Sequence, residues 1–345
     1  MRWRSSGESR FEPWSEDMTI QSANQTHWLN GAALRIVRLR RLILLLAFVF
    51  AGTLVSGSPL DAQQAEAEAE VEVADNGTNP GALGFKFMPY SRSTELDNGV
   101  KDVDMLALFS MVPLPFISPF TAVVFEWPVL KYRDYSSVLE GTDPEEIGGP
   151  PNFPAGLPPG IDTQRLARGD LTGWGDFRIR LIQGLHKFEG INTLLMVGGD
   201  VILPFASDLG LSSGKYQVAP MIVTVTNFSP TSFMAILHFY FMDVGDSAHE
   251  GSDQMGEIGF YLARIFFQKA WPSSGYYLLP EIQFIYDSKV ADDVSSTSLW
   301  FGPEVGKSWK SGTTAMTAYL KPGFGISADP GERKWSVEMG MRFIP

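Results

Sequence analysis

The sequence predicts an all-β chain: an antiparallel transmembrane β-barrel of about twelve strands, preceded by an N-terminal targeting segment. Three observations lead to this fold class. One basic and apolar segment near the N-terminus is typical of an export signal. The remainder divides into stretches rich in aromatic and β-branched residues, each long enough to cross a bilayer as a tilted strand. The connections between these stretches are alternately short and long, as in outer-membrane barrels.

The targeting segment comprises a basic stretch at residues 35–41, an apolar core at residues 42–55 and small residues up to Ala62. The apolar core is shorter than the roughly 20 residues that a membrane-spanning helix needs, so a cleaved secretory signal is favoured over an uncleaved anchor. We expect residues 1–62 to be an N-terminal extension plus signal peptide. Residues 63–80 are rich in Ala and Glu and lack aromatics, which predicts a flexible periplasmic leader. The barrel should occupy residues 81–345.

Composition excludes several classes of function. The chain has 27 Lys and Arg against 39 Asp and Glu, a formal net charge of −12, which argues against nucleic acid as a partner. It has no cysteine, which excludes disulfides, thiolate catalysis, thiolate metal sites and a lipid anchor on cysteine. No cofactor or metal is implied.

The expected strands follow one another along the whole barrel region. They are placed at 81–90, 100–112, 117–131, 171–187, 191–204, 214–228, 231–244, 255–269, 275–287, 295–309, 313–326 and 334–344. An even number is usual for bacterial single-chain barrels and puts both ends of the barrel domain in the periplasm.

The connections support this count. Those after even-numbered strands are tight, for example Ser229-Pro230 and residues 310–312. Those after odd-numbered strands are longer and polar: 91–99, 245–254 and 287–294. Short turns on one side and long loops on the other distinguish a membrane barrel from a soluble β-sandwich, the main alternative.

Alternation within single strands points the same way. In the last strand Trp335, Met339 and Phe343 share one face, whereas Glu338 and Arg342 share the other. The period is two, and only one face tolerates charge. In an exported barrel the apolar face should meet lipid.

The same alternation places a set of charged residues on inward faces, because charge at bilayer depth is tolerated only toward a wet or paired interior. The expected lumen-lining residues are Glu126, Arg178, Arg180, Asp200, Glu281, Glu304, Lys321, Glu338 and Arg342. They could line a polar channel that selects solutes. For these particular residues a closed, salt-bridged interior that holds the wall together is slightly favoured.

The longest connection runs from Tyr132 to Asp170 and contains six prolines, so it cannot be regular structure throughout. It could fold into the lumen as a constriction, or extend into solvent as a mobile loop.

The sequence contains few of the residue patterns that are typical of catalytic sites. Beyond residue 62 the only histidines are His186, His238 and His249, and there is no nucleophile elbow or two-histidine metal spacing. His238 near Asp243, or His186 near acidic residues, could contribute to an outer-membrane enzyme, but a lone strand histidine more often lines a lumen. An acidic loop lacks the spacing of a dedicated calcium site and is more readily explained as solvated surface; its members are Asp243, Asp246, His249, Glu250 and Asp253.

Three segments carry a family resemblance: residues 171–177 (LTGWGDF), 203–207 (LPFAS) and 210–216 (GLSSGKY). In these the chain resembles the outer-membrane proteins grouped with the meta-pathway phenol-degradation family, most clearly over residues 170–230. The resemblance implies a barrel associated with uptake of aromatic or other hydrophobic compounds, and it implies no site residues. Phe205-Ala206-Ser207 departs from the Thr-Gly that usually follows the proline in that family.

Together these features predict a channel or transporter for small molecules, hydrophobic or aromatic ones included, in the outer membrane of a Gram-negative bacterium. Its partners would be outer-membrane lipid, the barrel-assembly machinery and a small-molecule solute. A structural barrel with a closed lumen is the first alternative, and an outer-membrane enzyme the second.

Overall fold

The computed structural model describes residues 77–96, 99–136, 170–249, 252, 257–271, 273–289, 297–327 and 333–345. These residues form one β-sheet with its connections. The expected extension and signal peptide, residues 1–62, lie outside the described residues, as does most of the leader expected at 63–80.

The described part of the chain contains thirteen strands and two short 3₁₀ helices. The strands are β1 (Lys86–Leu96), β2 (Lys101–Pro113), β3 (Thr121–Asp134), β4 (Asp170–Gly173), β5 (Phe177–Phe188), β6 (Thr193–Leu203), β7 (Lys215–Ser229), β8 (Ser232–Asp246), β9 (Gly259–Trp271), β10 (Tyr276–Asp287), β11 (Thr297–Ser311), β12 (Thr314–Ser327) and β13 (Arg333–Ile344). The helices are η1 (Glu189–Ile191) and η2 (Leu209–Leu211). Among the described residues, no helix has the length and apolar character needed to cross a membrane.

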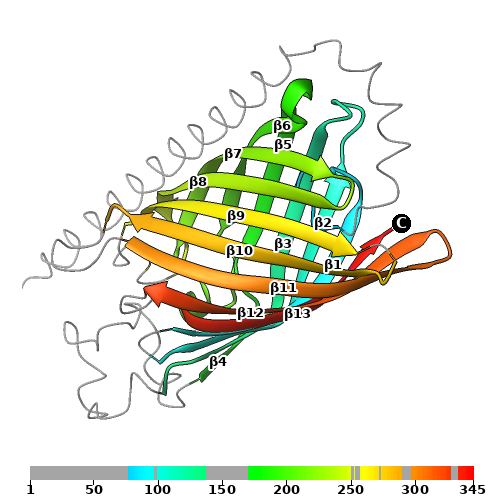
Figure 1. Ribbon diagram of the computed structural model, residues 1–345. Coiled ribbons are helices and arrows are strands. Elements are labelled where there is room, and N and C mark those ends of the chain that lie inside the picture. Colours follow the sequence, from blue (N-terminus) through cyan, green and yellow to red (C-terminus); the bar gives the residue numbers. More distant parts are fainter. Residues whose placement is uncertain are drawn as a thin grey trace, which may run out of the picture. The chain divides into compact units, whose positions relative to one another are not determined.

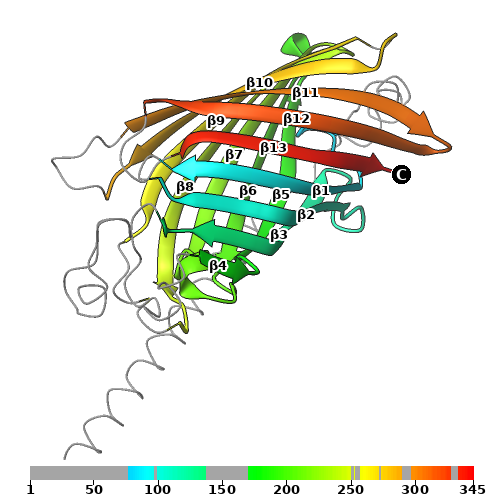
Figure 2. The same cartoon turned by 90° about the horizontal axis from the view of Figure 1, so that it is seen from below.

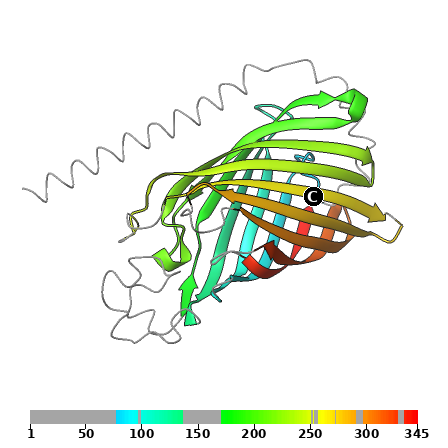
Figure 3. The same ribbon diagram turned by 60° about the vertical axis from the view of Figure 1, so that its left-hand side comes forward.

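The sheet is antiparallel and closed on itself (Figure 1). Nearly all neighbours in the sheet are consecutive in the chain, and β1 pairs with β13 to close the ring, as Figure 2 shows. Both β4 and β5 pair with β3, at different heights, so they are two parts of one barrel strand. The thirteen segments therefore make a twelve-stranded barrel, whose strands run obliquely around it (Figure 3). The predicted fold is confirmed.

The strand faces sort by polarity. Large apolar side chains are exposed on the outer surface, among them Phe87, Trp127, Ile222, Ile265, Phe267, Ile282, Phe284, Val305, Leu320, Phe324 and Met339. A closed ladder satisfies the backbone groups of the wall, and an apolar outer surface suits lipid. This is the architecture of a barrel that crosses an outer membrane.

The two ends of the barrel differ as the sequence predicts. At one end, the turn end, neighbouring strands are joined by short connections such as 230–231 and 312–313. At the other, the loop end, they are joined by longer ones, 135–169, 204–214 and 247–258. In outer-membrane barrels the turn end faces the periplasm.

The first strand departs from its prediction. It spans Lys86–Leu96 rather than residues 81–90, so its connection to β2 is short, whereas a long loop was expected at 91–99. Residues 81–85 are apolar and glycine-containing, which imitates a strand, but they precede β1: Leu83 packs against the buried apolar cluster, whereas Phe85 is 42% exposed. The apolar pattern therefore predicted neither the secondary structure of this segment nor the exposure of Phe85.

One close approach inside the wall requires glycine. The indole of Trp300 lies flat over the neighbouring strand positions, and a Cβ added at Gly302 or Gly323 would lie 1.9 Å from its ring atoms. Trp300 is consequently buried on the inner side, and its ring forms a platform for two cations, Lys321 and Arg333, at 5.6 and 4.9 Å from the ring centroid.

Candidate functional site: the barrel interior

Charged side chains on strands that are not neighbours meet each other in this barrel. Lys321 on β12 reaches Glu281 on β10, and Arg342 on β13 reaches Glu304 on β11. A strand separates the partners in each case, so their side chains can meet only on the concave side of the wall. Each of the nine residues predicted to face inward has an ion pair or a hydrogen bond with another of these interior side chains, in the three clusters described below.

The first cluster is centred on Glu281, whose side chain has no exposed surface. Its carboxylate accepts a hydrogen bond from Arg264 Nε at 2.5 Å, one from Gln283 Nε2 at 2.6 Å, and one from Lys321 Nζ. Two cations and an amide therefore compensate the desolvation of this one acid.

The second cluster joins Glu304 to Arg342 through two hydrogen bonds of 2.8 Å. The Tyr277 hydroxyl donates to Glu304 at 2.7 Å and accepts from Arg342 at 2.7 Å. Tyr319 lies beneath the Arg342 guanidinium, 4.1 Å from ring centroid to Cζ, and donates to Glu338 at 3.0 Å. Glu338 is thereby connected to the same cluster.

The third cluster lies on β3, β5 and β6. Arg180 and Asp200 form a bidentate pair, with Nε–Oδ1 and Nη2–Oδ2 distances of 2.5 and 2.8 Å. Arg178 lies 3.2 Å from Glu126 and 3.7 Å from Asp200. Glu126 also accepts a hydrogen bond from the Tyr90 hydroxyl at 2.5 Å.

Several charged members of these clusters escaped the sequence prediction. Arg264 lies on β9, where both faces are largely apolar, so alternation gave no sign of its direction. Arg92, paired with Asp104 at 2.6 Å, escaped because the first strand was misplaced. A signal that could have found Arg264 is its register opposite Gln283, which only strand pairing reveals.

The other half of the interior is apolar. Met196, Val223, Ala235, Leu237 and Phe239, on β6 to β8, are buried and pack together. The cations border this layer, with Arg180 Cζ 5.1 Å from the centroid of the Phe239 ring. The interior is thus divided into an ionic half and an apolar half. The sequence predicted one polar lining, because alternation shows where charged residues face inward. It cannot distinguish an apolar face that points inward from one that points outward.

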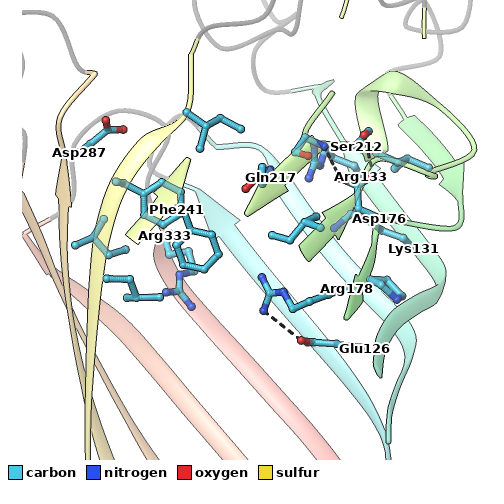
Figure 4. Close-up of a pocket in the computed structure, with 18 of the residues that line it drawn as sticks. Glu126, Lys131, Arg133, Asp176, Arg178, Ser212, Gln217, Phe241, Asp287 and Arg333 are labelled. Atoms are coloured by element: carbon cyan, nitrogen blue, oxygen red, sulfur yellow. Dashed lines mark hydrogen bonds and ion pairs between the residues drawn. The ribbon is translucent and has the colours of Figure 1, made fainter. Parts of the chain in front are cut away.

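A cavity of about 630 Å³, here called the vestibule, opens among these groups toward the loop end (Figure 4). Its apolar wall comes from β8 to β10 and includes Phe241, Phe260, Leu262 and Ile285. Its polar side comes mainly from β3, β5 and the residues next to η2 and includes Glu126, Lys131, Arg133, Asp176, Arg178, Ser212 and Ser213. Arg92 and Arg333 also line it.

The segments that carry the family resemblance form the rim on one side. The Asp176 carboxylate accepts hydrogen bonds from Ser212 Oγ at 2.8 Å and from the Ser213 amide at 2.6 Å. Trp174 donates its indole N–H to the Phe205 carbonyl at 2.7 Å. A Cβ at Gly173 would lie 1.7 Å from Ser207 Oγ, so the loop packs against bare backbone there. The motif therefore fastens the 204–214 connection over the strand ends.

The same rim contains a buried tyrosine outside the strands. The Tyr135 hydroxyl donates to the Gly210 carbonyl at 2.7 Å, and burial raises the pKa of Tyr135. At the exposed edge, the hydrogen bond from Lys289 Nζ lowers the pKa of Glu257, 2.6 Å away. The remainder of the proline-rich connection, residues 137–169, lies outside the described residues, so its predicted role as a constriction stays a prediction.

Neither of the two strand histidines belongs to a catalytic arrangement within the described residues. His238 lies opposite the exposed Ile222 and contacts the Tyr261 hydroxyl, so it faces outward. A register shift between Gly184 and His186 turns His186 outward against Phe188. The expectation that such strand histidines line the lumen is wrong for both. The shift in β5 and the two apolar faces of β8 are the physical reasons.

The acidic loop is held by other contacts. Asp246 pairs with Lys215 at 2.6 Å, Asp243 accepts from the Ile258 amide at 3.3 Å, and His249 Nε2 lies 3.0 Å from the Ala206 carbonyl oxygen. Glu250 and Asp253 lie outside the described residues. Where the structure is described, no group of three or more His, Asp or Glu residues is arranged to hold a metal ion.

Residues 77–85, here called the N-terminal strap, cross the interior at the turn end. Thr78 hydrogen bonds to Gln268 on β9, and Asn79 Nδ2 lies 3.4 Å from Asn227 Oδ1 on β7. Gly77 lies against Arg342 on β13, whereas Gly81 lies against Leu194 on β6. The strap therefore contacts opposite sides of the barrel, and Lys86 Nζ anchors its end by donating to the Asn79 carbonyl at 3.1 Å.

No family model and no curated protein matches the sequence. Among solved structures, the chain is similar to an outer-membrane channel from Pseudomonas putida F1, with 13% identity, 77% of this chain and 98% of that chain covered, and a TM-score of 0.50. It is also similar to the NanC porin (7% identity, 76% and 100% covered, TM-score 0.47) and to outer membrane phospholipase A from Escherichia coli (12%, 76% and 92%, 0.36). At such identities the likeness shows the fold alone, that of an outer-membrane β-barrel.

Proposed function

We propose that this protein is an outer-membrane channel or transporter for small molecules, hydrophobic or aromatic ones included. The observation that carries the proposal is the vestibule, whose volume of about 630 Å³ lies in the range of small-molecule sites. A barrel serving only as a structural element has no need of such a cavity. The motif resemblance over residues 170–230 favours the same solute class, and its residues hold the rim of this cavity.

The vestibule has the features of a selective entrance. Its apolar wall, with Phe241 and Phe260 stacked at 4.6 Å between ring centroids, offers a surface for rings or alkyl chains. The facing cations and acids offer polar contacts that fix orientation. A solute entering from the loop end would pass between them before reaching the ionic clusters and the strap.

A closed structural barrel is the second candidate, favoured by a separate observation. Glu281, Glu304 and Asp200 are almost fully buried and paired, and the strap crosses the turn end. Under that reading the ionic clusters stabilise the wall and the vestibule ends blindly.

Reconstitution of the full chain into lipid separates the two. Planar-bilayer recordings should give single-channel steps, and aromatic solutes added on the loop side should reduce the ion current by occupying the vestibule. Proteoliposomes should also take up a small aromatic solute faster than protein-free liposomes. Folded, inserted protein that neither conducts nor admits solute would reject the channel and support the structural barrel.

A further inference from the structure

The deep end of the vestibule brings together three guanidinium groups from distant parts of the chain. Arg92 comes from β1, Arg178 from β5 and Arg333 from the start of β13, and all three line the cavity. Figure 4 shows Arg178 and Arg333 projecting toward the hollow from opposite sides.

The carboxylates that accompany these cations are less exposed than the cations are. The side chains of Arg92 and Arg178 are 34% and 31% exposed, whereas their partners Asp104 and Asp200 are 3% and 0% exposed. The guanidinium groups thus face the cavity, and Asp104 and Asp200 lie behind them. Glu126, 3.2 Å from Arg178 and 22% exposed, lines the cavity as well, so Arg178 is already paired with an acid on the cavity side.

Arg333 differs from the other two. Its hydrogen bond is to Gln283, a neutral amide, and its guanidinium lies 4.9 Å from the centroid of the Trp300 ring. Within the described part of the chain, no carboxylate lies within 4 Å of Arg333, whereas Arg92 and Arg178 each have at least one. Stacking on an aromatic ring orients a guanidinium and leaves its N–H edge available to an anion.

The opposite wall is unsuited to a second charge. Phe241, Phe260, Leu262 and Ile285 surround this side of the cavity with apolar atoms. A ligand that satisfies both walls has one anionic group and an apolar body. A carboxylate matches the planar fork of arginine with two parallel hydrogen bonds.

We propose that the vestibule binds a small aromatic or aliphatic monocarboxylate, with the carboxylate on Arg333, flanked by Arg92 and Arg178, and the apolar body against Phe241 and Phe260. The inference rests on the proposed function, since it names the class of solute that the channel admits. Arg333 is the residue that discriminates acid from neutral analogue, and the phenylalanines accept both.

Calorimetric titration of the full chain in lipid nanodiscs tests this, with empty nanodiscs as the blank. The probes are 2-naphthoate and its uncharged analogue 2-naphthamide. Loss of one charge-assisted contact is expected to weaken binding roughly tenfold or more, so naphthoate should bind at least that much more tightly than naphthamide. Arg333→Gln should abolish the difference by weakening naphthoate alone, and Arg333→Lys should restore part of it.

Two further variants separate charge from packing. Phe260→Ala should weaken both probes, because it removes apolar surface that each contacts. Lys307→Gln removes an exposed cation near the turn end, 5.2 Å from the centroid of the Tyr276 ring and not among the residues that line the vestibule, and should change neither. If Arg333→Gln lacks the heat-modifiable folded form, Arg178→Gln replaces it and should weaken naphthoate selectively.

Equal affinity for the two probes, unchanged naphthoate binding in Arg333→Gln, or an equal loss in Lys307→Gln would overturn the inference. These outcomes are separable from failure of the channel itself. A parent protein that conducts but does not distinguish the probes refutes the monocarboxylate site and leaves the channel standing. A parent protein that distinguishes the probes but does not conduct supports the monocarboxylate site and refutes the channel.

Discussion

Asp200 on β6 lies directly opposite Arg180 on β5, and its fully buried carboxylate accepts hydrogen bonds from both Nε and Nη2 of that arginine. A second arginine, Arg178, stands 3.7 Å away. The negative charge of Asp200 is therefore compensated by two arginines, Arg180 at hydrogen-bond distance and Arg178 farther away.

Removing the closer cation should destabilise the barrel strongly. Arg180→Gln leaves a buried charge with one distant partner, and breaking such a pair typically costs about 3–5 kcal/mol. Because Arg178 can move toward Asp200, we expect the lower end of that range. Arg178→Gln, at a side chain 31% exposed, should cost only about 1 kcal/mol. Urea unfolding in lipid, followed by tryptophan fluorescence, gives both values.

The comparison of these two variants also reports on water in the lumen. Small and equal losses would mean that water solvates the freed acid, and the variants should then shift ion selectivity toward cations. A large loss confined to Arg180→Gln indicates a dry, paired environment around Asp200.

The aromatic platform at Trp300 gives a prediction with an internal control. Gly323→Ala places a Cβ 1.9 Å from the indole and must displace it, together with the cations above, at a cost of roughly 1–3 kcal/mol. Gly245→Ala introduces the same methyl group where no heavy atom lies within 4 Å, and should change the free energy of unfolding by less than about 0.5 kcal/mol. Equal effects of the two substitutions would contradict the packing described for Trp300.

Most of the architecture was predictable, because a barrel wall repeats a simple rule. Strand spacing, closure and the two kinds of connection follow from hydrophobic alternation and turn residues, and eleven of the twelve barrel strands lie within several residues of their expected bounds. The exception, β1, was displaced by the strap, whose apolar residues imitate a strand, although Leu83 packs against the core and Phe85 is exposed. A one-dimensional pattern cannot tell which apolar surface will cover such residues.

The interior was predictable only as a set of charges. Alternation indicated that Glu281 and Lys321 share a face, but it could not show that they meet across β11, since that depends on curvature and register. Alternation also missed Arg333, which is the first residue of β13. No strand residue precedes it, so its face could not be assigned by comparison with residues on both sides. The vestibule arises from the way strands far apart in sequence face each other.

Topology can be checked by surface labelling. Short epitope tags inserted at Gly190 or Gly312, in turn-end connections, should be inaccessible on intact cells. A tag after Lys289, in a loop-end connection, should be accessible. Permeabilised cells should label all three. Labelling at Gly190 or Gly312 without permeabilisation would invert the orientation.

The seam between the first and last strands should control assembly. Phe87 and Phe343 are register partners across β1 and β13, with ring centroids 6.3 Å apart on the outer face. Phe343→Ala should lower the yield of heat-modifiable, membrane-inserted protein. Deletion of residues 335–345 should lower it further, because β1 and β12 would present unpaired backbone to lipid. Phe284→Ala, an exposed outer aromatic away from the seam, is the matched control and should assemble normally.

The strap should limit conductance at the turn end. It contacts β6, β7, β9 and β13, so it occupies space that ions would otherwise use. Deleting residues 77–84 should raise single-channel conductance while leaving β1 intact from Lys86. The paired substitution Gln268→Ala with Asn227→Ala removes two side-chain anchors and keeps the chain, so it should produce intermediate or fluctuating conductance. Planar-bilayer recording of the three proteins tests this, and identical conductance in all three would show that the strap does not obstruct the ion path.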